Sequence, residues 1–108
     1  MIPRAAIALV LTLAVAGCGG ATGHPGRRLF VSSRCGECHT LADAGTRGGV
    51  GPDFDTSERL DRRQLMTALV AGVNGMPSYR RALSRRQRAL LADYLLAVAW
   101  KRGGQTGG

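Results

Sequence analysis

Two cysteines and a histidine within five residues form the part of the sequence best suited to chemistry. The run is Cys35-Gly36-Glu37-Cys38-His39, a C-x-x-C-H pattern, which is typical of the covalent attachment of a c-type haem. Thiols three positions apart share one helical turn, so both can add to the vinyl groups of one haem. The adjoining imidazole of His39 can then bind the iron as its proximal ligand. The pattern therefore predicts one haem c, with its iron, per chain.

A C-x-x-C pair on its own also occurs in thioredoxin-like redox sites and as half of a zinc site. Zinc needs four ligands, but outside this run the chain offers only Cys18, in a targeting segment, and His24, in a glycine-rich stretch. A thioredoxin-like pair expects a βαβ context, and the sequence contains no convincing strand. We therefore favour haem attachment over both alternatives.

The N-terminus has the features of an export signal. Arg4 is followed by an apolar stretch over residues 5–16, which is too short to span a bilayer comfortably. The stretch ends in Val-Ala-Gly-Cys at Cys18, which resembles the lipobox of bacterial lipoproteins. We expect residues 1–17 to be a lipoprotein signal peptide, and 18–25 to be a lipid anchor on Cys18 with a flexible tether. An ordinary cleavable signal and an uncleaved membrane helix are the alternatives.

Cysteine usage and charge agree with an exported chain. Of the 3 cysteines, one is assigned to lipid and two to haem, which leaves none for a disulfide. The 15 basic and 7 acidic residues give a net charge of +8, which suits nucleic acid, anionic lipid or an acidic protein partner. Export argues against nucleic acid, so we expect none as a partner.

A short helix and a loop are expected around the haem-binding run. Apolar Leu29 and Phe30 indicate an amphipathic helix over residues 26–33, leading into the run. Residues 40–56 after it are rich in glycine and contain one proline, which excludes regular structure. Leu41 and Phe54 are the expected buried contacts of this loop.

Two further helices are each predicted by a capping box, in which the N-cap and N3 side chains bond to each other's backbone. Asp61 with Gln64 starts one helix, and Gly72 ends it. Ser84 with Gln87 starts the other, which should extend to about residue 102 and be followed by a disordered tail over 103–108. Its inner face carries a set of apolar residues, namely Leu90, Leu91, Tyr94, Leu95 and Val98.

Iron bound by His39 needs a sixth ligand or keeps an open position, and this choice separates an electron carrier from a ligand-binding haem protein. Met1 is lost with the signal, and Met66 lies in a predicted helix where core packing accounts for it. Met76 lies before a proline in a turn over residues 73–77, outside any helical apolar stripe. Its thioether is the candidate sixth ligand.

The order and spacing of these motifs resemble those of small class I cytochromes c over about residues 26–100. Gly26 and Phe30 match the first helix of that class, which crosses the last helix near Tyr94. Pro52 matches the proline whose carbonyl accepts a hydrogen bond from the proximal imidazole, and Met76 matches the axial methionine.

This resemblance implies an all-α fold in which three main helices and their loops wrap around one covalently attached haem. The cytochrome c domain would occupy residues 26–102. Cys35 and Cys38 would hold the haem covalently, and His39 and Met76 would be its axial ligands. The surrounding residues would be Pro52, Phe54, Leu41 and Leu69.

One departure from the class concerns the haem propionates. No tryptophan precedes the methionine turn, since the only one is Trp100, so an indole partner for a propionate is not evident. Arg59, Arg62 and Arg63 are candidates by position alone.

A soft thioether ligand raises the reduction potential, and an apolar shell excludes water, so such a site is suited to carrying single electrons. No constellation of nucleophile, acid and base occurs in the sequence. We therefore expect a membrane-tethered electron carrier, not an enzyme. It would act outside the cytoplasm, either between respiratory complexes or from a dehydrogenase to a terminal oxidase. The alternatives are a five-coordinate haem protein that binds a gas or peroxide, and a haem subunit of a larger oxidoreductase.

Overall fold

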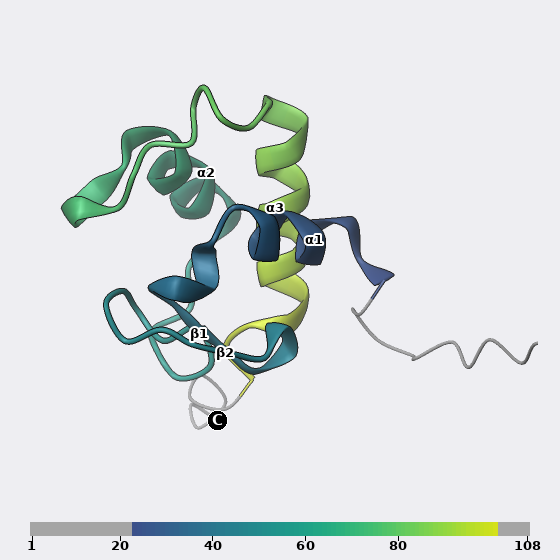
Figure 1. Ribbon diagram of the computed structural model, residues 1–108, viewed down its shortest axis with the longest axis vertical. Coiled ribbons are helices and arrows are strands. Elements are labelled where there is room, and N and C mark those ends of the chain that lie inside the picture. Colours follow the sequence, from purple (N-terminus) through teal and green to yellow (C-terminus); the bar gives the residue numbers. More distant parts are fainter. Residues whose placement is uncertain (1–22, 102–108) are drawn as a thin grey trace, which may run out of the picture.

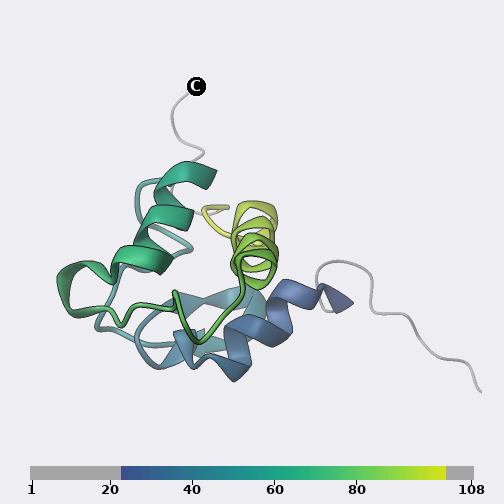
Figure 2. The same cartoon turned by 90° about the horizontal axis from the view of Figure 1, so that it is seen from above.

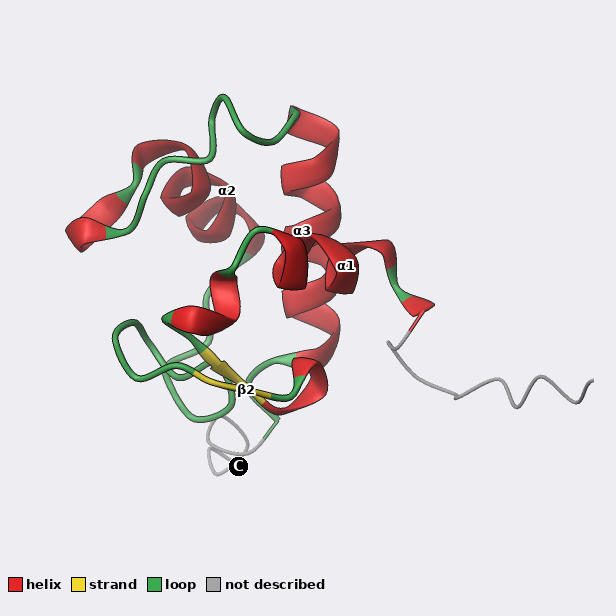
Figure 3. Cartoon of the chain, viewed as in Figure 1, coloured by secondary structure: helices red, strands yellow, loops and turns green. Residues whose placement is uncertain are grey.

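Three helices account for most of the regular structure. The computed structural model describes residues 23–101, in which α1 spans Pro25–Ser32, α2 spans Arg62–Ala71 and α3 spans Arg85–Val98 (Figure 1). Figure 3 shows that loops join these helices and that strand within residues 23–101 is confined to one short pair. The arrangement confirms the expected all-α, class I cytochrome c fold.

Short turns and one small ladder complete the described chain. Three 3₁₀ turns are formed by Cys35–Glu37 (η2), Ala42–Ala44 (η3) and Val73–Gly75 (η4). The strands β1 (Thr40–Leu41) and β2 (Thr46–Arg47) pair antiparallel. This ladder was not expected from the glycine-rich sequence, because two residues per strand are too few to give an alternating pattern.

The first helix begins earlier than the sequence indicated. Pro25 occupies its first turn, where a fixed φ and a missing N–H cost nothing. His24, which we had placed in the tether, is the N-cap, and its Nδ1 accepts the Gly26 N–H at 2.9 Å. The folded domain therefore includes His24, and capping by histidine was missed because serine, threonine, aspartate and asparagine are the usual N-caps.

The crossing of α1 over α3 depends on Gly26, as expected. A Cβ at this position would lie 2.3 Å from the carbonyl oxygen of Leu90 and 2.4 Å from the Cβ of Tyr94. Only glycine permits so close an approach of the two backbones. Figure 2 shows α1 lying directly against α3, and the side chain of Phe30 is fully buried between them and the loop that carries Phe54.

Both predicted capping boxes are present. The Asp61 side chain accepts the Gln64 N–H at 2.8 Å, and the Gln64 side chain accepts the Asp61 N–H. Ser84 and Gln87 make the same reciprocal pair at the start of α3. Helix α2 ends at Gly72, as predicted, and Gly72 has a left-handed φ of 62°.

The core is one cluster that the three helices and the long loop share. Its largest fully buried side chains are Tyr94, Phe30, Leu41 and Leu91. The Tyr94 hydroxyl donates to the carboxylate of Asp43. Burial, and then this hydrogen bond and the charge of Asp43, raise the pKa of Tyr94 well above its ordinary value.

The predicted signal peptide, the lipid-bearing Cys18 and the tail over 103–108 lie outside the described residues. Among residues 23–101, no helix has the length and apolar character needed to cross a membrane.

Candidate functional site

A tight turn brings the two thiols and the imidazole together. Arg34 has a left-handed φ of 62°, which turns the chain from α1 into η2. The His39 N–H then donates to the Cys35 carbonyl at 2.9 Å. Cys35 is buried and Cys38 half-buried, and no disulfide joins them.

The environment of the thiols does not suit a thiol–disulfide redox centre. Burial raises the pKa of Cys35 to about 11, so the thiol stays protonated at neutral pH. Reactive C-x-x-C pairs need a thiolate, and their pKa values are lowered by nearby positive charge or a helix N-terminus. The thioredoxin-like alternative therefore has no support at this site.

The described residues give no support for a zinc site either. Within the part of the chain that the structure describes, no group of three or more His, Cys, Asp or Glu side chains is placed to hold a metal ion. A structural zinc requires four such ligands.

The His39 imidazole is oriented by its surroundings. Its Nδ1 lies 2.8 Å from the carbonyl oxygen of Pro52, and because a carbonyl only accepts, Nδ1 carries the proton. The other ring nitrogen, Nε2, is then unprotonated and is the nitrogen that can bind iron. Gly51 leaves the space that this ring occupies, since a Cβ there would lie 2.4 Å from the imidazole Cε1.

Phe54 forms a wall against the same imidazole. The two rings are stacked with centroids 4.3 Å apart and planes 16° apart. Phe54 and Leu41 are buried, as predicted, and so is Leu69 on α2. Each of the pocket residues named from the sequence therefore belongs to the core or contacts the imidazole.

The turn that carries Met76 has the backbone expected of it. Asn74 and Gly75 have positive φ values of 52° and 85°, and Met76 itself is extended, as proline at the next position requires. The Met76 N–H donates to the Val73 carbonyl at 3.0 Å. Its side chain is half-buried and packs against the core cluster.

Tyr79 secures this turn and was missed from the sequence. Its N–H donates to the Leu69 carbonyl at 2.7 Å, and its hydroxyl donates to the Ser33 carbonyl at 3.1 Å. Ser33 lies two residues before Cys35, so one side chain links the methionine turn to the haem-binding run. The sequence offered one indication of this role, namely an aromatic residue in a segment that was not predicted to be helical.

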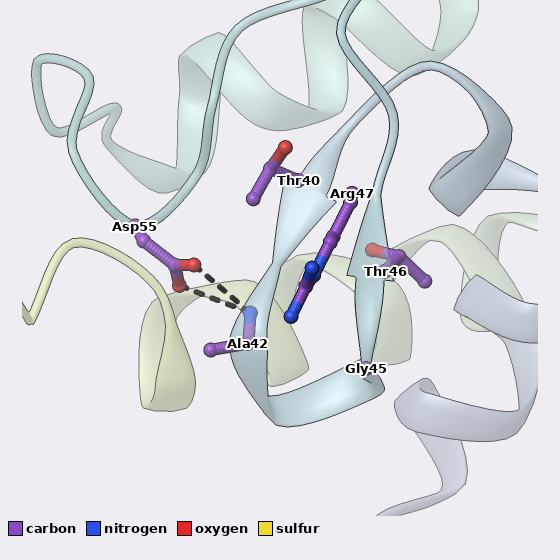
Figure 4. A pocket seen from close by; sticks show the side chains of 6 residues that line it. All are labelled: Thr40, Ala42, Gly45, Thr46, Arg47 and Asp55. Atoms are coloured by element: carbon purple, nitrogen blue, oxygen red, sulfur yellow. Dashed lines mark hydrogen bonds between the residues drawn. The ribbon is translucent and has the colours of Figure 1, made fainter.

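A small polar hollow lies on the β1–β2 side of the loop (Figure 4). It is lined by Thr40, Ala42, Gly45, Thr46, Arg47 and Asp55. Both carboxylate oxygens of Asp55 accept the Ala42 N–H, at 3.2 and 3.0 Å. None of the predicted ligands lines this hollow, and the role of Asp55 is to join the two sides of the loop next to Phe54.

The residues present fit a c-type haem. Two cysteines without a disulfide lie on one turn. An imidazole follows them, with its Nδ1 hydrogen-bonded to Pro52 and its Nε2 available to bind iron. Gly51 provides the space for that imidazole, and a thioether is presented from a separate turn. A c-type haem takes from the protein two cysteines for covalent attachment to its vinyl groups, and an imidazole and a methionine thioether as ligands of the iron.

The comparisons with known proteins agree with this geometry. The family described as cytochrome C oxidase, cbb3-type, subunit III, matches residues 21–95, which is more than half of the 108 residues. The chain belongs to this cytochrome c family. It carries covalently bound haem c and is a haem-based electron-transfer protein.

A solved structure supports the same assignment. The c-type cytochrome SorU from Sinorhizobium meliloti is 34% identical, and the match covers 74% of this chain and 93% of SorU with a TM-score of 0.65. A comparison with curated proteins finds no match.

Two of the three arginines considered for the haem propionates have other contacts in this cytochrome. The guanidinium of Arg59 lies 5.7 Å from the centroid of the Trp100 ring, and Arg62 pairs with Asp93 on α3. Arg63 is exposed. None of these contacts supports a propionate role for Arg59 or Arg62.

Proposed function

We propose that this cytochrome transfers single electrons with Cys35 and Cys38 holding the haem and His39 and Met76 as the axial ligands of its iron. The observation that carries the proposal is the hydrogen bond from His39 Nδ1 to the Pro52 carbonyl. It leaves Nε2 as the ligating atom and fixes the orientation of the imidazole.

When bound, the haem supplies an iron that alternates between the ferrous and ferric states. The protein residues keep the surroundings of the iron constant during that change. Phe54, Leu41 and Leu69 exclude water, and Tyr79 holds the methionine turn against the haem-binding run. A constant, dry environment lowers the reorganisation that each electron transfer requires.

The proposed location is the outer side of a bacterial cell membrane, with the chain anchored through lipid on Cys18. The apolar stretch over residues 5–16 and the Val-Ala-Gly-Cys sequence support this. Residues 19–23 would leave only a short tether before the N-cap at His24. The haem domain would then work close to the membrane surface.

The partners proposed are redox proteins with an acidic docking surface. Four exposed arginines, Arg80, Arg81, Arg85 and Arg86, follow the methionine turn, and no acidic residue occurs between Asp61 and Asp93. Two of them lie in the first turn of α3, where the helix dipole disfavours positive charge. These positive charges destabilise the start of the helix. Their presence there supports a role in binding an anionic surface.

Two measurements on the purified holoprotein test the proposal. One is a potentiometric titration, and the other is the absorption spectrum of the ferrous protein with and without carbon monoxide. We expect one reversible one-electron transition and no carbon monoxide adduct, because both axial positions are filled. Binding of carbon monoxide by the untreated ferrous protein would favour the five-coordinate alternative.

A further inference from the structure

We propose that Phe54 and Trp100 form a two-layer aromatic wall that fixes the orientation of the His39 imidazole, with Trp100 as a positioning residue. The inference rests on the proposed role of His39 as an axial ligand. It assigns a role to the only tryptophan of the chain, which the sequence patterns left without one.

The first layer of the wall is the ring of Phe54. It lies face to face with the imidazole, with 4.3 Å between centroids, and both side chains are only 7% exposed. The hydrogen bond to Pro52 fixes one atom of the imidazole, whereas a stacked ring blocks rotation of its whole plane. Phe54 also keeps water from that face of the ligand.

The backbone of Phe54 is held from two sides. Its N–H donates to the Thr40 carbonyl at 2.9 Å, and its carbonyl accepts the Trp100 N–H at 2.6 Å. Thr40 directly follows His39, so one bond connects Phe54 to the haem-binding run. The other connects it to the chain beyond α3.

Trp100 is the second layer. Its ring meets Phe54 edge-on, with 5.8 Å between centroids and 75° between planes, and it is only 2% exposed. Its indole N–H donates to the Ser57 hydroxyl at 3.2 Å. Trp100 has a φ of 59°, a left-handed conformation that bulky residues rarely adopt. Such a conformation persists only where the surrounding contacts impose it.

Phe30 provides a matched control within the same core. It also meets Phe54 edge-on, at 6.4 Å between centroids, and is fully buried. It belongs to α1, however, and its other aromatic neighbour is Tyr94. Truncation of Phe30 therefore removes a comparable aromatic contact without releasing the Trp100 side of Phe54.

The experiment compares holoproteins carrying Trp100→Leu, Trp100→Phe and Phe30→Leu with the wild type. The readouts are the reduction potential and the hyperfine-shifted haem-methyl resonances of the ferric protein, which report the orientation of the axial imidazole. We expect Trp100→Leu to change the resonance pattern and to lower the potential. Phe54 can then tilt and admit water, which stabilises the more highly charged ferric state. Trp100→Phe keeps an aromatic ring at this position, so both readouts should stay near the wild-type values. Phe30→Leu should also leave both near the wild-type values.

Two results would overturn the inference. One is a wild-type resonance pattern and potential in Trp100→Leu, and the other is an equal change in Phe30→Leu. If Trp100→Leu does not fold, Trp100→Met takes its place against Phe30→Leu, with the same readouts and the same expected changes. A wild-type holoprotein without a low-spin, histidine-ligated spectrum would instead refute the proposed function, which separates the two failures.

Discussion

The Nδ1 of His39 and the carbonyl oxygen of Pro52, 13 residues apart in sequence, lie 2.8 Å apart. The bond selects the tautomer of the imidazole and so determines which nitrogen would bind the iron in the proposed site. It also closes the loop between β1 and Pro52, which places Phe54 against the ring. This one hydrogen bond thus sets both the tautomer of His39 and the position of the loop that packs against its ring.

Replacement of Met76 by alanine should open the sixth position while the haem stays covalently attached. In the proposed site, attachment uses Cys35 and Cys38 only, whereas the thioether comes from a separate turn. Binding of added imidazole or cyanide, followed by absorption, measures the effect. Met66→Ala is the control, because Met66 packs against the core from α2, and it should retain the wild-type spectrum. A low-spin Met76→Ala protein that binds no added ligand would show that Met76 is not the ligand.

Gly26→Ala should destabilise the fold by about 1–3 kcal/mol, a typical cost of overpacking. The added methyl group would collide with the backbone of Leu90, which cannot move without shifting α3. Denaturant unfolding of the holoprotein measures the change. Gly23→Ala, where a Cβ meets nothing within 4 Å, should stay within about 0.5 kcal/mol of the wild type. Equal stability of the two variants would contradict the close helix crossing.

The sequence predicted the features that depend on neighbouring residues. It did not predict the contacts between distant segments. The capping boxes at Asp61 and Ser84 and the turn at Met76 depend on residues within a few positions of one another, so spacing alone predicts them. The contacts of Tyr79 and Trp100 join segments tens of residues apart. No periodicity encodes such contacts.

Two local predictions also needed correction for physical reasons. His24 was assigned to the tether because glycines surround it, yet its ring caps α1 and lies 5.6 Å from the Tyr94 ring between centroids. The β1–β2 pair was missed because its strands are too short to show alternation.

The stability of the fold should fall at alkaline pH because of Tyr94. Burial, and then the bond to Asp43, raise its pKa in the folded state, so the protonated hydroxyl is stabilised by folding. That contribution is complete below the unfolded pKa of about 10. It is lost as the pH rises through the folded value.

Unfolding free energies at pH 8 and pH 11 measure this dependence. The wild type should lose more stability over that interval than Tyr94→Phe, which has no group to titrate there. Asp43→Asn keeps the burial of Tyr94 but removes the carboxylate charge, so its loss should lie between the two. Identical pH profiles for wild type and Tyr94→Phe would contradict the assignment.

Cys18→Ser should release the protein from membranes or block processing of its precursor. Lipid on one cysteine carrying two or more acyl chains is sufficient for stable anchoring. Fractionation of cells that produce the wild-type or variant chain, followed by mass spectrometry of the N-terminus, checks this. A variant that fractionates like the wild type would favour an uncleaved N-terminal helix over lipidation.

The absorption spectrum of the purified ferric holoprotein tests the central claim most directly. Ligation of the iron by His39 and Met76 predicts a low-spin spectrum with a methionine-to-iron charge-transfer band that disappears in Met76→Ala. A high-spin spectrum without that band in the wild type would contradict the account, because the sixth position would then be open and the protein would be suited to binding a ligand.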